Sequence, residues 1–487
     1  MKDCMKITIH RGTHQIGGCV TEYEYNGWRL FVDYGEELQG GPKSGKLEVE
    51  GLTKGDLSKS ALLITHYHGD HIGCITELAS ELPIYIGKTG REIQFVLSDH
   101  LKSVDGVHQE MLERLKKSLT FEAGKKFSFG PFEIMPITID HSAFDAYAFK
   151  ITVDDVKVFH TGDFRTHGFR SSKLPKVIKT FVGEVDYVVS EATNVVRPNS
   201  TSQTEQELQL DFIKSFKEHK GNIVYMSSTN IDRLFSLYHA ALKAKRPFFV
   251  DSYQKKIMDV VVKRDTLWGK SRLYQYGDFE PIELQYEKNE FRINEKFKDV
   301  LERGGYVLIA RVNPRFNNFI EKLPGEKTKY LSMWKGYVDP NNEAYNSNLA
   351  EVLGDKYKPM HTSGHCDMNS MREFLRLLNP MAIIPIHTDS PTDFARLFCD
   401  EWPIILLDDG DSISPISSRY ADSISALVTY GKQKKRGLGF FRRTEDAKSV
   451  LSHIYIGPEE KLGYEIWEEE DLMSEKKESG LLSELQG

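Results

Sequence analysis

The stretch Thr65–Gly73, THYHGDHIG, constrains the fold of this chain more than any other part of the sequence. It places three histidines and an aspartate within six positions. The apolar run SALLI directly before it predicts a buried strand, glycines 69 and 73 predict a turn, and ITELASEL has helical spacing. In α/β proteins the carboxyl end of a strand is where chemistry is commonly placed. The stretch therefore predicts an α/β fold with a functional loop at this strand end.

The side chains of this loop are of the types that bind divalent cations. Zinc prefers neutral imidazole nitrogens and carboxylates. His66 and His68 alternate around Tyr67, so both are expected on one side of an extended loop. Asp70 and His71 follow a glycine that lets the backbone turn. A lone histidine pair is more often structural, but four such residues in this spacing predict a metal site.

Three more ligand candidates follow expected strands. The strand FEIMPITID precedes His141, the strand VKVFH precedes Asp163, and the strand MAIIPI precedes His387. Singly each would be a weak signal, since a strand-end histidine is more often satisfied by hydrogen bonds. With the first four residues they supply seven ligands, which is enough for two ions.

Strand-like and helical runs alternate along the 487 residues, which predicts an α/β protein of two or three domains. Residues 89–119 have the spacing of one long helix. The pattern of apolar and polar runs changes near residue 196, where a separate α/β unit is expected. The charge-rich end of the chain predicts an exposed helix or partial disorder. The expected segments are 1–195, 196–345, 346–430 as a return to the first domain, and a charged tail 431–487.

Bulk properties restrict the class of protein. No apolar run approaches the roughly 18 residues of a membrane span, and the amino terminus has no signal-type apolar region. The five cysteines are odd in number and form no CxxC pair, which predicts free thiols and a cytoplasmic location without membrane association. The net charge of −7 argues mildly against a broadly basic nucleic-acid-binding surface, although a local basic channel is compatible with it.

The combination of HxHxDH, a later histidine, TGDF and Asp33 in FVDYG resembles the metallo-β-lactamase superfamily, along the chain to about residue 420. The resemblance implies an αββα sandwich with two metal sites. Its first site would use His66, His68 and His141. Its second would use Asp70, His71 and His387, with Asp163 bridging both ions and Asp33 orienting ligands without binding metal.

A second set of motifs resembles the β-CASP nucleases, relatives of ribonuclease J. The motifs are YVVSEATN, SSTNIDR, LSMWKGY, HTSGHCDM and PIHTDSP. The resemblance implies an inserted α/β β-CASP domain and assigns Glu191, His365 and His387 to the motifs A, B and C. Histidine at motif C favours action on RNA, because the DNA-repair members typically carry valine there.

The expected function is a metal-dependent phosphodiesterase that cleaves single-stranded RNA. Two divalent ions, Zn²⁺ or alternatively Mn²⁺, would flank a bridging hydroxide and stabilise charge on the phosphorane. The expected catalytic residues are Asp70, His365 and Glu191: His365 would protonate the leaving oxygen and Glu191 would orient its imidazole. His361, Ser363 and Gly364 would bind a neighbouring phosphate, with a structural role for their loop as the alternative.

Other functions remain open from the sequence. A β-CASP DNA nuclease is the first alternative, a small-molecule metallo-hydrolase is less favoured, and the complete ligand set argues against a metal-free RNA-binding scaffold. Endonuclease and 5′-exonuclease action are both compatible with the motifs, and a homodimer is an open expectation. Lys432–Arg443 interleaves basic residues with Phe440 and Phe441, which fits either base stacking or a solvated loop.

Overall fold

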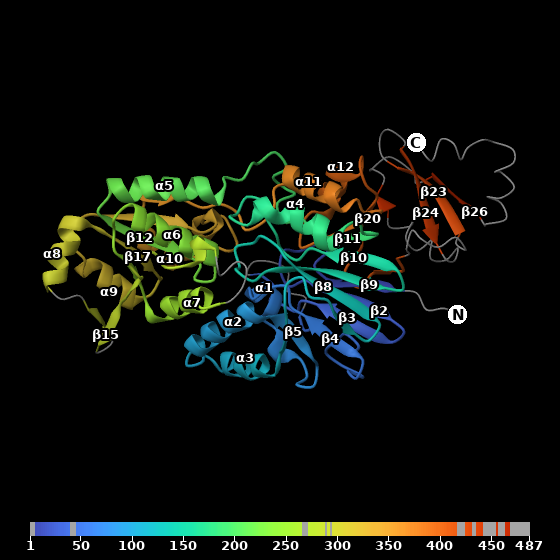
Figure 1. Cartoon of the computed structure of the whole chain (residues 1–487), viewed down its shortest axis with the longest axis horizontal. Coiled ribbons are helices and arrows are strands. Elements are labelled where there is room, and N and C mark those ends of the chain that lie inside the picture. The colour runs from blue at the N-terminus through green and yellow to red at the C-terminus, as the bar shows by residue number, and fades with distance from the viewer. Residues whose placement is uncertain are drawn as a thin grey trace.

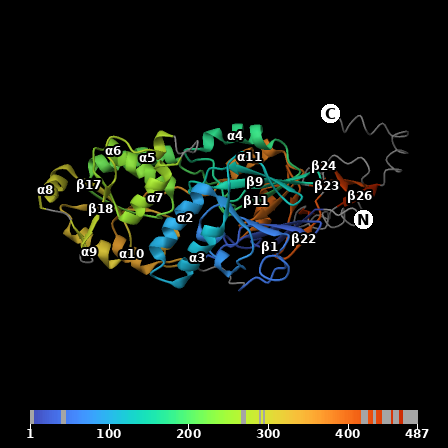
Figure 2. The ribbon, with the colours of Figure 1, turned by 60° about the horizontal axis from the view of Figure 1, so that its bottom comes forward.

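The computed structural model describes residues 5–38, 45–264, 271–287, 290–292, 295–415, 424–430, 435–441, 454–455 and 463–467. Two sheets lie face to face with helices on their outer sides, and a third sheet with its own helices lies at one end of this sandwich (Figure 1). Figure 2, turned by 60°, shows the same separation between the two parts.

The first sheet has the order β22-β1-β2-β3-β4-β5-β6. Asn26 and Gly27, both with positive φ, form the tight hairpin turn between β2 and β3. From β3 to β6 the strands are parallel, so their carboxyl ends meet at one edge. The bounds are β1 Lys6–Arg11, β2 Val20–Tyr25, β3 Trp28–Val32, β4 Ser60–Leu63, β5 Ile84–Gly87, β6 Leu119–Phe121 and β22 Ser412–Ile413.

The second sheet has the order β25-β21-β20-β11-β10-β9-β8-β7. Its strands β10, β11, β20 and β21 are parallel, while β7, β8 and β9 pair antiparallel. The bounds are β7 Phe127–Phe129, β8 Phe132–Thr138, β9 Tyr147–Val153, β10 Val156–His160, β11 Tyr187–Glu191, β20 Ala382–Ile386, β21 Ile404–Ile405 and β25 Ile454–Tyr455.

Alternating apolar side chains build the core on both faces of each sheet. Between the sheets, Leu30 and Leu63 of the first join one cluster with Phe149 and Val158 of the second. The outer face of the first sheet is covered by α2 (Lys88–Leu101) and α3 (Gly106–Lys117). The outer face of the second is covered by α4 (Leu174–Val177), α11 (Met368–Leu378) and α12 (Pro391–Phe398). This αββα sandwich confirms the expected fold class.

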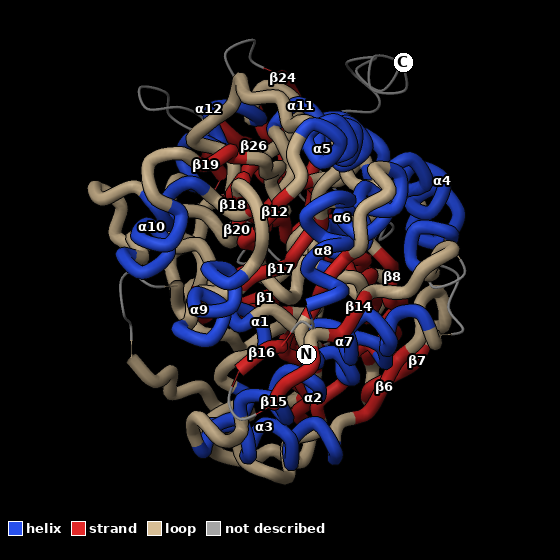
Figure 3. Tube along the Cα trace, turned by 90° about the vertical axis from the view of Figure 1, so that its left-hand side faces the viewer, coloured by secondary structure: helices blue, strands red, loops and turns tan. Residues whose placement is uncertain are grey.

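The third sheet is parallel throughout, in the order β14-β13-β17-β12-β18-β19. Figure 3 shows α5 and α6 on one side of its central strands and α9 and α10 on the other. The bounds of its elements are α5 Glu205–Glu218, β12 Gly221–Met226, α6 Ile231–Lys243, β13 Phe248–Val250, α7 Ser252–Val262, β14 Ile282–Glu283, α8 Glu295–Gly304, β17 Tyr306–Ala310, α9 Pro314–Lys322, β18 Lys327–Ser332, α10 Ser347–Leu353 and β19 Tyr357–Pro359. A separate hairpin joins β15 (Gln285–Glu287) to β16 (Glu290–Arg292). β19 belongs to this third sheet, although its residues fall within 346–430, the segment that was expected to return to the first domain. The expected segment boundaries stay a prediction.

A buried charged cluster fastens the insertion to the sandwich. Arg165, which follows β10, contacts Asp140 at 3.2 Å, Glu205 of α5 at 2.8 Å and Asp232 of α6 at 2.9 Å. Arg233 of α6 donates two further hydrogen bonds to Glu205. The side chains of Arg165, Glu205 and Asp232 have no exposed surface, so each charge depends on the others for its stabilisation.

One expectation about helices was wrong. Residues 89–119 form α2 and α3 rather than one helix, because Asp105 accepts a hydrogen bond from the backbone of His108 and begins a new helix at Gly106. The strand β23 Ile424–Tyr430 pairs with β24 Lys435–Phe441 and β26 Gly463–Trp467, which with β25 are the described parts of the tail. The charged end of the tail lies outside the described residues, so its expected exposed helix or partial disorder stays a prediction. The side chains of Lys432–Arg443 lie outside the described residues. Within the part of the chain that is described, no helix combines the length and apolar character needed to cross a bilayer.

Candidate metal centre

The predicted metal ligands come from loops at the carboxyl ends of strands in both sheets. His66 and His68 follow β4, and Asp70 and His71 lie in the short helix α1 (Gly69–Ile72). His141 follows β8, Asp163 follows β10 and His387 directly follows β20. The structure brings all of them together in neighbouring groups. Face-to-face packing of the two sheets thus joins residues that are far apart in sequence.

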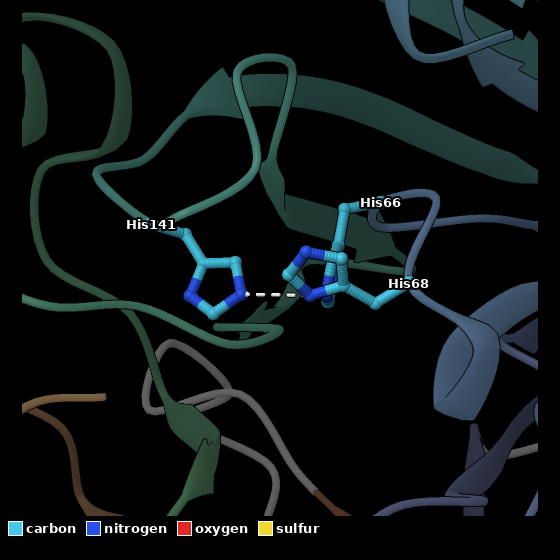
Figure 4. A group of neighbouring side chains, drawn as sticks. All are labelled: His66, His68 and His141. Carbon is cyan, nitrogen blue, oxygen red and sulfur yellow. Dashed lines mark hydrogen bonds between the residues drawn. The ribbon is translucent and has the colours of Figure 1, made fainter. Parts of the chain in front are cut away.

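His66, His68 and His141 form the first group (Figure 4). Nε2 of His66 lies 3.0 Å from Nδ1 of His68, and Nε2 of His141 lies 3.2 Å from the same atom. Burial lowers the pKa of all three histidines, to about 4 for His68. Their imidazoles are therefore neutral at pH 7, which is the form that ligates a metal.

Asp70, His71, Asp163 and His387 form the second group. Nε2 of His71 lies 3.1 Å from Oδ2 of Asp163, and Nε2 of His387 lies 3.5 Å from Oδ2 of Asp70. Although burial opposes the shift, Asp163, Asp70 and Asp33 raise the pKa of His71. This half of the centre concentrates negative charge where a cation would be stabilised.

Orphaned polar atoms test whether these residues fit a metal. Oδ1 of Asp163 and Nε2 of His387 are buried and have no hydrogen-bond partner among the described residues. Unsatisfied buried atoms of this kind are costly unless an ion or another ligand takes them. Nitrogen and carboxylate donors in two adjoining groups, with Asp163 between them, fit divalent cations of the zinc or manganese type.

Other polar groups fix the orientation of the ligands. Asp33 accepts hydrogen bonds of 2.7 Å from the backbone and hydroxyl of Thr65 and from Nδ1 of His71. Its role as an orienting residue was expected. Thr193, which sequence reasoning missed, places its hydroxyl 2.8 Å from Nδ1 of His387. In His71 and His387, Nδ1 makes the hydrogen bond described here, and Nε2 of the same ring faces the other predicted ligands.

Glu191 and His365 lie beside the second group, and with His387 they form a third. Nδ1 of His365 is 3.6 Å from Oε2 of Glu191 and 3.8 Å from Oδ2 of Asp163. Burial alone would lower the pKa of His365, but Asp163 and Glu191 raise it to about 9. Glu191 is itself anchored, since it accepts hydrogen bonds from the backbones of Thr193 and Cys366. At neutral pH His365 is thus protonated, and it lies beside the proposed metal ligands.

The loop His361–His365 contacts the centre through its backbone. The carbonyl of Gly364 accepts a 2.7 Å hydrogen bond from Nδ1 of His141, a contact that the sequence did not suggest. Ser363 accepts hydrogen bonds through its hydroxyl from Asn194 and through its carbonyl from His167. His361 is half-buried, and its Nδ1, which solvent does not reach, has no hydrogen-bond partner among the described residues.

Asn194, Arg165 and His167 were missed as residues that hold this loop. The side-chain amide of Asn194 donates to the carbonyls of His365 and Cys366, and Arg165 donates to that of Ser363. Their only signal in the sequence is proximity to the motifs: Asn194 ends SEATN, and Arg165 follows TGDF. Such contacts depend on chain segments that come together only in the fold.

Comparison with protein families gives one match, over residues 355–405, to the family described as the Zn-dependent metallo-hydrolase RNA specificity domain. This segment contains the loop His361–His365 and His387. Comparison with solved structures gives a protein of unknown function from Enterococcus faecalis V583, with a TM-score of 0.65 and 18% identity. The match covers 84% of this chain and 99% of that one, and it supports the fold.

Curated relatives are similar over most of the chain. Ribonuclease J of Mycoplasma genitalium is 25% identical over 78% of this chain and 67% of its own. Ribonuclease J of Helicobacter pylori is 26% identical over 85% of this chain and 61% of its own. Ribonuclease J of Mycolicibacterium smegmatis is 26% identical over 89% of this chain and 78% of its own. The chain thus spans about three fifths of the length of the Helicobacter relative.

Proposed function

We propose that this chain is a metal-dependent nuclease that cleaves single-stranded RNA. The premise is that it is a ribonuclease J-like protein of the metallo-β-lactamase superfamily. The observation that carries the proposal is the meeting of the ligand groups with His365 and Glu191 at one point. Neutral histidines and buried carboxylates can hold metal ions, and a protonated histidine can act as an acid, which together suit the hydrolysis of a phosphodiester.

The metal-holding residues are proposed as the two groups described above. His66, His68 and His141 would hold one divalent ion, and Asp70, His71 and His387 a second, with Asp163 shared between them. When bound, such ions supply Lewis-acid charge that activates water and offsets negative charge on the phosphate. Asp33 and Thr193 contact Nδ1 of His71 and His387, so Nε2 of each ring would be the atom that holds an ion.

His365 is proposed as the acid that donates its proton to the leaving oxygen. Its raised pKa keeps the proton in place near pH 7, and its Nδ1 has no hydrogen-bond partner among the described residues. Glu191, fixed by two backbone hydrogen bonds, holds the charged imidazole by electrostatic attraction. A positioned acid of this kind contributes typically 10²–10⁴-fold to a rate.

An extended strand is proposed as the substrate because the insertion approaches the centre directly. The carbonyl of Thr229, in the loop after β12, accepts a hydrogen bond from Tyr67, which lies between two ligand histidines. The backbone of Ile231 donates to the carbonyl of Ser142, next to His141. His361, Ser363 and Gly364 are proposed to contact a phosphate, since the loop that they form lies between the insertion and the metal ligands.

The choice of RNA rests on the ribonuclease J relatives and on histidine at position 387. The test is incubation of purified protein, loaded with Zn²⁺ or Mn²⁺, with 5′- and 3′-labelled single-stranded RNA and DNA of equal sequence. Faster cleavage of RNA is expected, and the two labels separate endonuclease from 5′-exonuclease products. Faster cleavage of DNA would instead favour the DNA nuclease, and cleavage of neither would remove the nuclease proposal.

A cytoplasmic location is proposed from the thiols. Cys19, Cys74 and Cys366 form no disulfide among the described residues, which is compatible with a reducing compartment. A homodimer stays a prediction.

A further inference from the structure

The segment that follows β18 carries exposed aromatic side chains. Trp334 is 42% exposed and Tyr337 is 40% exposed, in and just before the 3₁₀ turn η5 (Lys335–Val338). Their rings pack edge to face, with centroids 5.7 Å apart and an angle of 83° between the planes. Tyrosine and tryptophan are enriched at surfaces that bind other molecules, so an exposed pair of packed rings is a candidate binding surface.

Gly336 shapes this pair. A Cβ atom at Gly336 would lie 2.3 Å from two carbons of the six-membered ring of Trp334, so that ring rests directly on the glycine backbone. The carbonyl of Tyr337 accepts a 2.8 Å hydrogen bond from the backbone of Asn346, which closes the loop behind the pair. With one face of Trp334 on Gly336, its exposed surface belongs to the opposite face and the edges. We call Trp334 and Tyr337 the aromatic pair.

The aromatic pair lies beside the candidate metal centre. Ser332, which ends β18, donates a 2.8 Å hydrogen bond to the carbonyl of Met360, and Met360 begins the loop that leads to His365. Arg233 of α6 donates to the hydroxyl of the same Ser332, which ties this strand end to the buried charged cluster. The aromatic pair, which closely follows Ser332 in the chain, therefore begins at the strand end that contacts the loop of His365.

We propose that Trp334 and Tyr337 form a stacking platform for one unpaired nucleobase, next to the phosphodiester that is cleaved. The inference rests on the proposed function, because it concerns how a strand is held at the same centre. Every nucleobase presents a flat π face, so a ring resting on a glycine can accept any of them. A paired base within a duplex has no free face, and the platform therefore favours single strands over duplexes.

Abasic substitution in the substrate tests the platform without altering the protein. Initial cleavage rates of the full-length, metal-loaded protein are measured on one RNA and on a series with a single abasic residue at successive positions. We expect kcat/KM to fall about 5- to 150-fold at one or two adjacent positions beside the cleaved bond, the range for loss of a stacked base. At the other positions the change should be small.

Protein variants show whether that position belongs to the aromatic pair. In Trp334→Ala, kcat/KM for unmodified RNA should fall by a similar factor, and the abasic residue should then cost nothing more. Trp334→Phe should keep the position dependence, because it keeps a flat ring. Phe279→Ala is the matched control: Phe279 is 75% exposed but precedes β14, at the opposite end of the parallel strands. The Phe279→Ala variant should show the same dependence of kcat/KM on the abasic position as the wild type.

Salt dependence separates stacking from contacts with phosphate. Loss of a stacked base should leave the slope of log KM against log salt unchanged, whereas loss of a charged contact lowers it. A flat abasic profile in a wild type that cleaves RNA would overturn the platform and leave the nuclease intact. Absence of cleavage of any nucleic acid would overturn both. If Trp334→Ala fails to fold, the wild-type profile and Trp334→Phe still decide.

Discussion

The carbonyl of Gly364 accepts a hydrogen bond from Nδ1 of His141 across 223 positions of sequence. The bond joins the loop that carries His365 to one of the ligand histidines, and it turns Nε2 of His141 toward His68. A Cβ atom at Gly364 would lie 3.2 Å from Cε1 of His141, so the loop packs closely on the ring. The position of the proposed acid and that of a proposed metal ligand therefore depend on one another.

Purified protein is expected to hold close to two divalent ions per chain, and His68→Ala should lose at least one. His68 faces both His66 and His141 through Nδ1, so its removal opens the first group. Elemental analysis measures the metal content. His219→Ala is the control and should keep both ions, because His219 precedes β12 and so lies at the opposite end of that strand from the loop that approaches the centre. A metal-free wild type that still cleaves would contradict the mechanism.

Asp33→Asn should weaken metal binding by roughly 10- to 100-fold, the usual cost of losing an orienting partner of a ligand. The amide keeps the size of the side chain but removes the charge that faces Nδ1 of His71. Asn is a suitable replacement because Asp33 has φ 60°, a conformation that asparagine tolerates well. Competition with a chromogenic chelator measures the affinity. An unchanged affinity would mean that Thr65 alone orients the site.

His365→Ala should keep its metal and slow cleavage by roughly 10²–10⁴-fold, because it removes a proton donor and no ligand. The variant is compared with the wild type in metal content and in single-turnover cleavage of the same RNA. If it loses metal, and recovers activity when metal is added back, His365 is a ligand. An unaltered rate with full metal content would remove it from the reaction altogether.

Glu205→Gln should destabilise the folded chain by about 3–5 kcal/mol, because it leaves the buried charges of Arg165 and Arg233 without their partner. Urea unfolding at neutral pH measures the difference from the wild type. Glu207→Gln, in the exposed first turn of the same helix, is the control and should change stability far less.

The difference in stability between the wild type and Glu205→Gln should depend on pH, in a direction set by the pKa of Glu205. Burial would raise the pKa of Glu205, but Arg233 and Arg165 lower it to about 2 from its ordinary value of 4.5. The stability contributed by its charge is therefore fully present above about pH 4.5 and is lost as the pH falls toward 2. The difference between wild type and Glu205→Gln should shrink over that range. A difference that stays constant with pH would contradict the assignment.

Much of the fold was predictable because its signals are local. The apolar runs that form β4, β8, β10 and β20 were recognised from composition and length. The break between α2 and α3 was not, because the periodicity continues through Asp105 and only its capping bond marks a new helix. The ribonuclease J-like relationship was also confirmed, since it rested on several short motifs in order along the chain.

The sequence by itself determined which residues are candidates for binding a metal, because His66, His68, Asp70 and His71 lie within six positions and the others follow strands. Only the tertiary structure decided what holds them. The contacts of Thr193 with His387, of Gly364 with His141 and of Ser332 with Met360 join segments that are brought together by the packing of the sheets and the insertion. A hydrogen bond has a reach of about 3 Å, so its partners are fixed by the folded path of the chain and leave no periodic signal in the sequence.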